Sequence, residues 1–209
     1  MGLSPIQSAV KRTFDLIGAV IGLALTWWLI ALAWVAATID TREDGFFRQR
    51  RVGLHGRSFD VIKIRTMRNV PGVDTTVTTL SDPRITRLGG LLRRTKIDEL
   101  PQLFNVLVGT MSFVGPRPDV PGFADKLVGD DRVLLTVRPG ITGPATLKYR
   151  DEEAILARQD DPESYNENVI FPDKVRINRE YIENWRLSQD LRYILWTATG
   201  VGKVNHAEQ

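Results

Sequence analysis

The hydrophobic pattern of the chain is dominated by one uncharged stretch near the N-terminus. Leu16 to Ile39 spans 24 residues without a charged side chain. As an α-helix it would be about 36 Å long, whereas the hydrocarbon core of a bilayer is about 30 Å thick. It exceeds the apolar region of a signal peptide, and no small-residue cleavage site follows it. We therefore expect residues 1–40 to form a membrane-anchoring helix, with a buried core helix as the alternative.

Basic residues lie on both sides of this stretch. They are Lys11 and Arg12 before it, and Arg42, Arg48, Arg50 and Arg51 after it. Because Lys and Arg beside a membrane segment favour the cytoplasmic side, we expect both ends there and a re-entrant helix rather than a spanning one. A re-entrant helix needs a bend, and in the absence of proline the candidate positions are Gly18, Gly22 and Thr26.

Beyond the anchor, one segment alternates as a β-strand does. In Phe59–Arg65 the side chains of Ile62 and Ile64 share one face, and those of Lys63 and Arg65 share the other. This segment is the one strand that the pattern predicts.

Three further regions have helical periodicity. Residues 85–92 and 99–107 are predicted to be helices, and Lys174–Thr199 one or two amphipathic helices. The acidic residues 151–167 are expected to form a surface helix and loop, and residues 201–209 a flexible tail.

Turns and loops are predicted where glycine, proline and short polar residues gather, at 53–56, 69–81, Gly115–Pro118 and Arg138–Pro144. Together the elements predict an α+β fold. Residues 41–200 are expected to be a mainly helical cytoplasmic domain with a small β element, attached to the membrane by the N-terminal helix and by interfacial amphipathic helices.

Composition narrows the chemistry. The chain has 209 residues, of which 43% are hydrophobic and 25% charged, so it is not a disordered chain. It contains no cysteine, which excludes disulfides and thiolate metal sites. The net charge is only +3, but Arg42 to Arg68 carries eight Lys or Arg residues against three acidic ones. Such a band either binds phosphates, lipid headgroups or nucleic acid, or is simply solvated.

The adjacent acids Asp98 and Glu99 form the most informative polar pair. Pro101 is tolerated in the first turn of a helix, where N–H groups lack intrahelical partners. We therefore expect a helix to begin at or just before Asp98, with Thr95 as a competing cap, which would place Asp98 at the positive end of the helix dipole.

Cations lie directly upstream of this pair, at Arg93, Arg94 and Lys96. With the dipole they would keep Asp98 ionised and attract a phosphate, so Asp98 is a candidate nucleophile. Glu99 is a candidate ligand for a divalent cation that bridges phosphate oxygens. The alternative is that both are ordinary acids in the first turn of a helix.

Four more cations are candidate phosphate ligands. Arg117 lies between two prolines, Arg138 precedes Pro-Gly, and Lys63 and Arg65 project from the predicted strand. Cations held on several rigid elements suit a diphosphate, which develops negative charge during transfer. Each of them taken alone is equally consistent with a surface residue.

Ordered motifs along the chain resemble one known family. They are Lys11–Asp15, Gln49–Gly53, Phe59–Met67, Asp98–Leu107, Met111–Pro118, Val137–Gly143 and Tyr181–Trp185. These segments closely resemble the bacterial sugar transferases, the monotopic phosphoglycosyl transferases that begin glycan assembly on undecaprenyl phosphate. The resemblance runs from about Lys11 to Thr199, which is nearly the whole chain.

The resemblance implies a two-step reaction. In the family, the aspartate of the pair attacks the sugar-linked phosphate of a UDP-sugar, UMP leaves, and the lipid phosphate then takes the phosphosugar. On the matching positions Asp98 would be the nucleophile, Glu99 a Mg²⁺ ligand, and Arg93 and Arg117 phosphate ligands. The implied partners are a UDP-sugar, undecaprenyl phosphate and membrane lipid, with the catalytic domain on the cytoplasmic face of the bacterial inner membrane.

The chain departs from the family pattern at three places. The Ser-Pro pair that usually breaks the membrane segment is missing, Thr110 stands where the family usually has Asp, and Asn178 stands where an Asp often precedes Tyr-Ile. The first departure bears on the bend of the helix, and the other two on nucleotide or sugar selection.

Two other functions are compatible with the same residues. One is a membrane-anchored hydrolase that passes the phosphosugar to water, and the other is a non-enzymatic binder of nucleic acid or acidic lipid. Because no zinc finger, RNA-binding sheet or helix-turn-helix motif is present, we expect no nucleic-acid partner. The identity of the sugar stays open, and an amphipathic aromatic surface would serve a homodimer or a membrane equally well.

Overall fold

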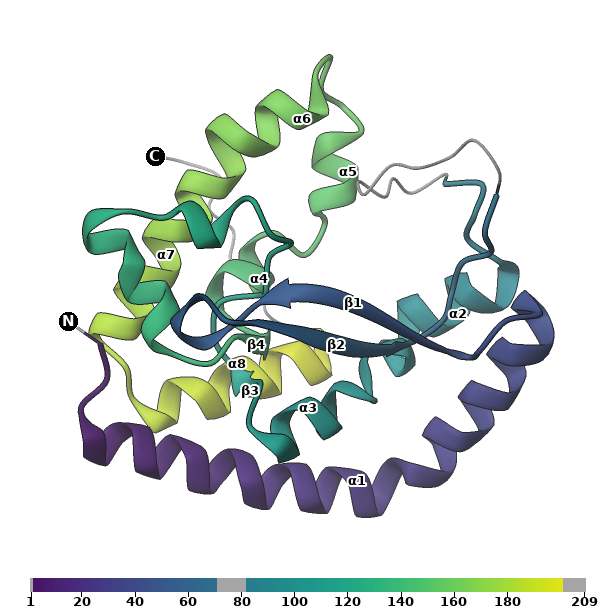
Figure 1. The fold of residues 1–209 in the computed structure, drawn as a ribbon, viewed down its shortest axis with the longest axis horizontal. Coiled ribbons are helices and arrows are strands. Elements are labelled where there is room, and N and C mark those ends of the chain that lie inside the picture. Colours follow the sequence, from purple (N-terminus) through teal and green to yellow (C-terminus); the bar gives the residue numbers. More distant parts are fainter. Residues whose placement is uncertain (1, 71–81, 201–209) are drawn as a thin grey trace.

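The computed structural model describes residues 2–70 and 82–200, so the predicted loop at 71–81 and the tail at 201–209 lie outside the described residues. Figure 1 shows helices arranged around two small sheets. The helices are α1 (Pro5–Thr41), α2 (Arg87–Thr95), α3 (Gln102–Val108), α4 (Pro144–Lys148), α5 (Glu152–Leu156), α6 (Pro162–Tyr165), α7 (Phe171–Glu183) and α8 (Leu187–Thr199). The strands are β1 (Phe46–Val52), β2 (Ser58–Ile64), β3 (Ser112–Val114) and β4 (Gly140–Thr142). This mainly helical fold with a small β element confirms the predicted class.

The predicted anchor is the single long helix α1. Ser4 begins it with a capping box, because its hydroxyl accepts from the Gln7 amide while the Gln7 side chain accepts from the Ser4 amide. Arg42 ends it in the left-handed conformation, at φ 61°. The helix is continuous over 37 residues, yet Figure 1 shows it curving in its second half around the domain. Thr26 donates its hydroxyl to the carbonyl of Gly22 at 2.7 Å, a bond of the kind that bends helices.

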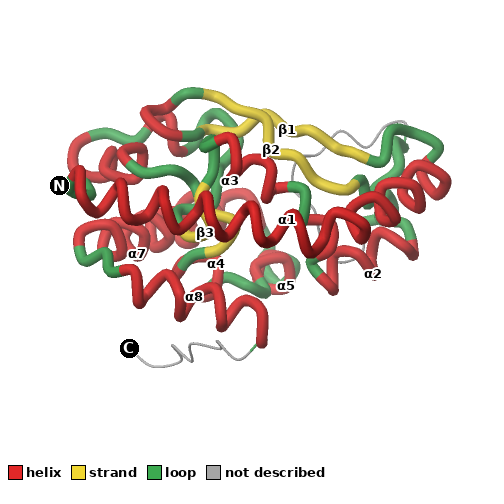
Figure 2. Tube along the Cα trace, turned by 90° about the horizontal axis from the view of Figure 1, so that it is seen from below, coloured by secondary structure: helices red, strands yellow, loops and turns green. Residues whose placement is uncertain are grey.

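Both ends of α1 pack against the same domain. Near the N-terminal end, Arg12 donates to the carbonyls of Val106 and Leu107 at the end of α3, and Asp15 accepts from the Ser112 hydroxyl. Near the C-terminal end, Ile30, Ala33 and Ala37 form an apolar cluster with Ile64 and Leu92. Figure 2 shows the helix crossing the whole face of the domain.

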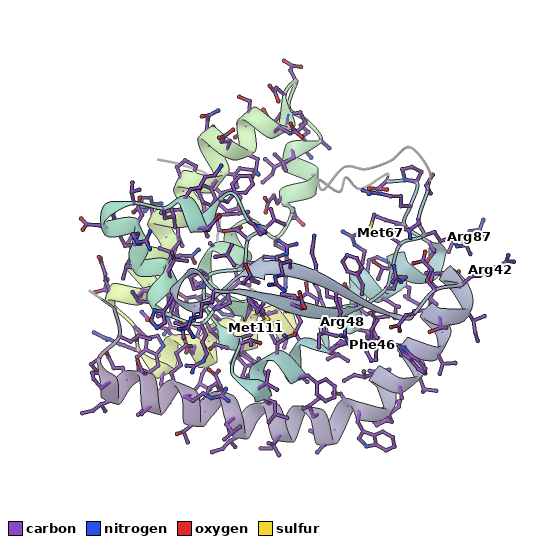
Figure 3. The ribbon with its side chains drawn as sticks, in the orientation of Figure 1. Arg42, Phe46, Arg48, Met67, Arg87 and Met111 are labelled. Atoms are coloured by element: carbon purple, nitrogen blue, oxygen red, sulfur yellow. The ribbon has the colours of Figure 1, made fainter. Side chains whose placement is uncertain are left out.

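Small residues allow α1 to lie close to its neighbours. A Cβ added at Gly18 would meet the ring of Phe113 at 2.7 Å, and one added at Gly22 would meet Leu103 at 3.1 Å. Ala19 is fully buried in a cluster with Met111, which Figure 3 places just above α1. The two glycines that the sequence offered as bend positions therefore also serve as contact points.

The predicted strand is β2, which pairs antiparallel with β1 across a turn at Leu54–Gly56. His55 and Gly56 both adopt positive φ there, so the predicted turn is confirmed. Strand β1 was not predicted, because its side chains are largely exposed and three of its seven residues are arginines, which hides the alternation.

A second, parallel pair joins β3 and β4. The sequence predicted a turn where β4 lies and made no assignment for β3. The pair lies against the main apolar cluster, to which α7 contributes Val175, Tyr181 and Ile182, while Leu187, Tyr193 and Ile194 of α8 pack against it. The predicted amphipathic region 174–199 thus forms two helices, and the acidic region forms the short helices α5 and α6 as expected.

Candidate active site

The Asp98–Glu99 pair lies in a sharp connection between two helices. Helix α2 ends at Lys96, which adopts the left-handed conformation, and a single 3₁₀ turn covers Ile97–Glu99. Helix α3 begins only at Gln102, with Pro101 as its cap. A helical turn therefore begins just before Asp98, as expected, but it is a 3₁₀ turn, and the α-helix starts only at Gln102. The left-handed Lys96, not Thr95, precedes this turn and separates it from α2.

Glu99 is held by cations from two other elements. The Arg117 guanidinium donates through Nη2 to Glu99 Oε1 at 3.0 Å, and Lys63 Nζ from β2 lies 3.6 Å from the same oxygen. The Glu99 side chain is 12% exposed, so these interactions are only weakly screened by water. The structure thus brings together three of the residues that the sequence singled out.

Arg117 is aimed at Glu99 by close packing of the β3–β4 pair. Gly115, directly after β3, approaches the chain so closely that an added Cβ would meet the carbonyl oxygen of Arg138 at 2.5 Å. The Gly115 amide donates to the carbonyl of Thr142, and the Gly140 amide donates to the carbonyl of Pro116. The prolines on either side of Arg117 then fix the backbone φ on both sides of it.

The two neighbouring acids have opposite electrostatics. Burial raises the pKa of Asp98 to about 6, helped by the charge of Glu99 and opposed by Lys63, Lys96 and Arg93. Burial alone would raise the pKa of Glu99 as well, but Arg117, Lys63 and Lys96 outweigh it and lower that pKa to about 2. The expected lowering of the Asp98 pKa by upstream cations is therefore outweighed by burial. At pH 7 a group with a pKa of about 6 is still roughly nine-tenths ionised.

Lys63 responds to the same charges. Burial and the charge of Arg117 together lower the pKa of Lys63 to about 8, against the opposing charges of Glu99 and Asp98. The ammonium is therefore predominantly charged at neutral pH, which keeps the cationic side of the site intact.

A cleft of about 780 Å³ opens beside Glu99. Its wall near Glu99 carries the cations Lys96, Arg117 and Arg51, and it continues between α4, α5, α6 and α7. This volume lies within the range of sites for nucleotide-sized ligands. A nucleoside diphosphate derivative could therefore place its phosphates at the cationic end and its remaining groups farther along.

The acidic pair fits a magnesium ion that is shared with a phosphate. Mg²⁺ beside phosphates is usually bound through one or two carboxylates, with water and phosphate oxygens completing its octahedron. Asp98 Oδ1 is buried and has no hydrogen-bond partner among the described residues. Among the described residues, no three or more acidic or histidine side chains form a group that could hold a metal ion. The donor set therefore suits a shared ion rather than an all-protein metal cage.

The other predicted phosphate ligands lie in different surroundings. Arg93 acts on the pKa of Asp98 through its charge, and its Nη1 lies 4.0 Å from the sulfur of Met67, which Figure 3 shows beside α2. Arg65 pairs with Glu43 at 3.0 Å, and Arg138 donates to the carbonyl of Gly109 at 2.8 Å. Within the part of the chain that the structure describes, neither Arg65 nor Arg138 makes a hydrogen bond or ion pair to Asp98 or Glu99.

Two residues of the cleft were not singled out from the sequence. Arg51 adds positive charge to the cleft, beside Lys96 and Arg117, and Asp119 lies two residues beyond Arg117. Burial raises the pKa of Asp119 to about 6, against the charges of Lys174 and Arg51. Arg51 was hidden in the basic band of β1, and only the fold brings Asp119 to the cleft.

The two departures from the family pattern differ in position. Thr110 donates to the carbonyl of Asn105 at 3.1 Å and so belongs to the end of α3. Asn178 is 5% exposed and lines the cleft. Of these two positions, the structure places Asn178 where it could touch a ligand.

Comparison with known proteins places these features in context. A family model described as bacterial sugar transferase matches residues 6–203. The chain is 39% identical over 197 residues to UDP-glucose:undecaprenyl-phosphate glucose-1-phosphate transferase of Xanthomonas campestris pv. campestris, an alignment that covers 91% of this chain but 38% of that protein. It is 34% identical over 204 residues to a protein of the same name from Caulobacter vibrioides, covering 94% of this chain and 71% of the relative.

A shorter relative matches almost end to end. The uncharacterized sugar transferase EpsL of Bacillus subtilis is 32% identical over 204 residues, which cover 94% of this chain and 92% of EpsL. The chain therefore spans less than half of the Xanthomonas relative but nearly all of EpsL.

Proposed function

The chain belongs to the bacterial sugar transferase family, and from this premise we propose that it transfers a sugar 1-phosphate from a UDP-sugar to undecaprenyl phosphate and releases UMP. The names of the Xanthomonas and Caulobacter relatives support both substrates. The observation that carries the proposal is Glu99 at the cationic end of a nucleotide-sized cleft, with the buried Asp98 as its neighbour in the chain.

In the first step, a carboxylate oxygen of Asp98 attacks the phosphorus that carries the sugar. A bond forms between that oxygen and phosphorus, and the bond from phosphorus to the bridging oxygen of UMP breaks. The electron pair leaves with UMP, and an aspartyl phosphosugar remains on the enzyme. The mostly ionised state of Asp98 at neutral pH supports this role.

Arg117 and Lys63 would stabilise the negative charge that develops on the diphosphate as UMP leaves. Both are already oriented by Glu99, so they need little reorganisation when the substrate binds. Glu99 would hold Mg²⁺, and that ion would supply charge neutralisation at the phosphate oxygens. Glu99 is thus a positioning residue for the two cations as well as a candidate metal ligand.

In the second step, an oxygen of undecaprenyl phosphate attacks the same phosphorus. The bond from phosphorus to Asp98 breaks and returns the carboxylate, which leaves a polyprenyl-diphosphate sugar. Because UMP departs before the lipid enters, the cleft never holds a soluble nucleotide and a lipid phosphate together.

The arrangement of α1 supports a membrane-embedded but non-spanning helix. Both ends contact the domain, and the outward face of α1 is apolar; its exposed large side chains include Leu16, Ile17, Val20, Ile21, Leu25, Trp27, Trp28, Leu32, Val35 and Ile39. Exposed apolar residues also occur on α3 and α8, at Phe104, Val108, Leu191 and Leu195. We place these helices at the cytoplasmic face of the bacterial inner membrane, where such a surface would be covered by lipid.

Release of UMP tests the transferase against the hydrolase. Membrane-reconstituted protein should release UMP steadily from one member of a panel of UDP-sugars when undecaprenyl phosphate is present. Without the lipid phosphate, release should stop after about one UMP per enzyme, because the covalent intermediate cannot turn over. Steady UMP release that is independent of the lipid phosphate would identify a hydrolase instead.

A further inference from the structure

Two buried polar atoms in the cleft have no hydrogen-bond partner among the described residues. They are the Oγ1 atom of Thr146 in α4 and the Oδ1 atom of Asn178 in α7. Both residues line the same cleft as Glu99. Unpartnered buried polar groups are uncommon in folded proteins because each costs free energy, and each therefore requires an explanation.

Asn178 is the stronger of the two signals. The residue is only 5% exposed, and the Oδ1 atom of its amide has no hydrogen-bond partner among the described residues. Phe171, Lys174 and Val175 line the cleft from the same side of α7, at the helical spacing of three and four residues. The Asn178 carboxamide thus lies at the end of a mostly apolar strip of α7 that is formed by Phe171, Lys174 and Val175.

A planar heterocycle matches this strip better than a sugar ring. The neighbouring walls are apolar, with Phe123, Leu134 and Leu135 facing the cleft as well. A carboxamide presents one donor and one acceptor side by side, which is the complement of the adjacent O4 and N3–H groups of uracil. A hexose would instead carry hydroxyl groups around its whole edge and leave several of them unpaired against such walls.

We infer that Asn178 and Thr146 form the uracil subsite of the cleft, with the Asn178 carboxamide pairing with the O4 and N3–H edge of the base. The Thr146 hydroxyl supplies one further donor or acceptor to the same ring. The phosphates then extend toward Lys96, Arg117 and Glu99 at the other end of the cleft. This assignment rests on the proposed use of a UDP-sugar and adds the part of the protein that selects its nucleotide.

Equilibrium binding of UMP to the full-length protein in detergent micelles tests the assignment. In Asn178→Leu the dissociation constant of UMP should rise by at least about tenfold, because two hydrogen bonds to the base are lost. Thr146→Val, which changes the shape of the side chain little, should raise it by roughly threefold. Ribose 5-phosphate, which lacks the base, should bind weakly and equally to all of these proteins.

Gln189 provides a matched control. Its Oε1 atom is also buried without a partner, but the residue does not line the cleft. Gln189→Leu should therefore bind UMP as the unmodified protein does, within about twofold. An equal loss of UMP binding in Gln189→Leu would mean that repacking, and not base recognition, causes the effect.

The outcomes separate this inference from the proposed function. If both cleft variants bind UMP normally while the KM for the UDP-sugar rises, these residues contact the sugar and the uracil assignment is wrong. If Asn178→Leu unfolds, Thr146→Val alone decides, and unchanged UMP binding in it overturns the assignment. If the unmodified protein releases no UMP from any UDP-sugar, the proposed function itself fails.

Discussion

Glu99 and Asp98 are neighbours in sequence, but the pKa values of their carboxyl groups are shifted in opposite directions. Glu99 faces Arg117 and Lys63 and stays ionised far below neutral pH, whereas the more weakly compensated Asp98 titrates near pH 6. The pKa values differ because Arg117 and Lys63 both form their ion pairs with Glu99 and not with Asp98. A carboxylate that is not tied up by cations is the better nucleophile, which supports the assignment of Asp98 to the covalent step.

Removal of the Arg117 charge should slow the reaction without unfolding the protein. Arg117→Ala should lower turnover by about 10²-fold, the scale for loss of one preorganised charge stabiliser. Arg117→Lys should recover part of that loss, since a lysine keeps the charge but not the planar guanidinium. Steady-state UMP release measures both variants.

Arg57→Ala is the matched control for this loss of charge. Arg57 is exposed and does not line the cleft. It should therefore leave turnover close to that of the unmodified protein. Near-normal turnover in a folded Arg117→Ala protein would remove Arg117 from the phosphate site.

The sequence predicted the identity of the acidic pair better than its surroundings. The order Asp-Glu-Leu-Pro and the proline-flanked Arg117 made these residues candidates, and the resemblance to the sugar transferases implied their roles. The sequence did not predict the 3₁₀ form of the turn at Ile97–Glu99 or the left-handed conformation of Lys96, because both depend on packing at the α2–α3 junction, which one-dimensional patterns do not contain. Asp119 and Asn178 were not assigned as site residues because only the fold brings them to the cleft.

Among the elements, α2 is positioned by a very close contact with the chain that leads into it. A Cβ on Gly89 would meet the backbone carbonyl of Thr66, whereas the nearest atom to a Cβ on Gly90 is Ile85 Cγ2 at 4.0 Å. Adjacent glycines of one helix therefore have opposite tolerance to substitution.

This difference predicts opposite effects of the same substitution. Gly90→Ala should raise stability by about 0.5–1 kcal/mol, because alanine restricts the unfolded chain at a site with free space. Gly89→Ala should lower stability by more than about 1 kcal/mol, because a backbone group must move. Thermal unfolding in micelles compares the two. Equal behaviour of both variants would contradict the close packing of α2 against Thr66.

Elements with strong hydrophobic periodicity were predictable, and those held by backbone contacts were not. α7 and α8 carry their own apolar faces, and β2 alternates. Strand β1 is rich in arginine, and β3 and β4 have three residues each, so neither gives a period-two signal.

For the whole molecule, the contacts of α1 at both ends restrict how the protein can sit in a membrane. A spanning helix would carry one end about 30 Å away, across the hydrocarbon core. That would break either the Arg12 contacts with α3 or the Ile30–Ala37 cluster. The re-entrant topology proposed above is also favoured by charge, because basic residues lie on both sides of the apolar stretch.

Cysteine labelling tests this topology in a chain that has no native cysteine. Ile6→Cys and Arg42→Cys should both resist a membrane-impermeant thiol reagent on intact cells, and both should react after the cells are opened. Both positions are exposed in the protein, so protection must come from the membrane. Labelling of one position but not the other on intact cells would indicate a spanning helix.

The most direct test of the account is the detection of a covalent intermediate on Asp98. Incubation with a UDP-sugar that supports UMP release, in the absence of lipid phosphate, should leave a phosphosugar on the protein that hydroxylamine removes. Peptide mass spectrometry should locate it at Asp98, and Asp98→Asn should lose both the adduct and turnover. An adduct on Glu99, or transfer that occurs only with both substrates bound and with no adduct at any time, would contradict the proposed mechanism.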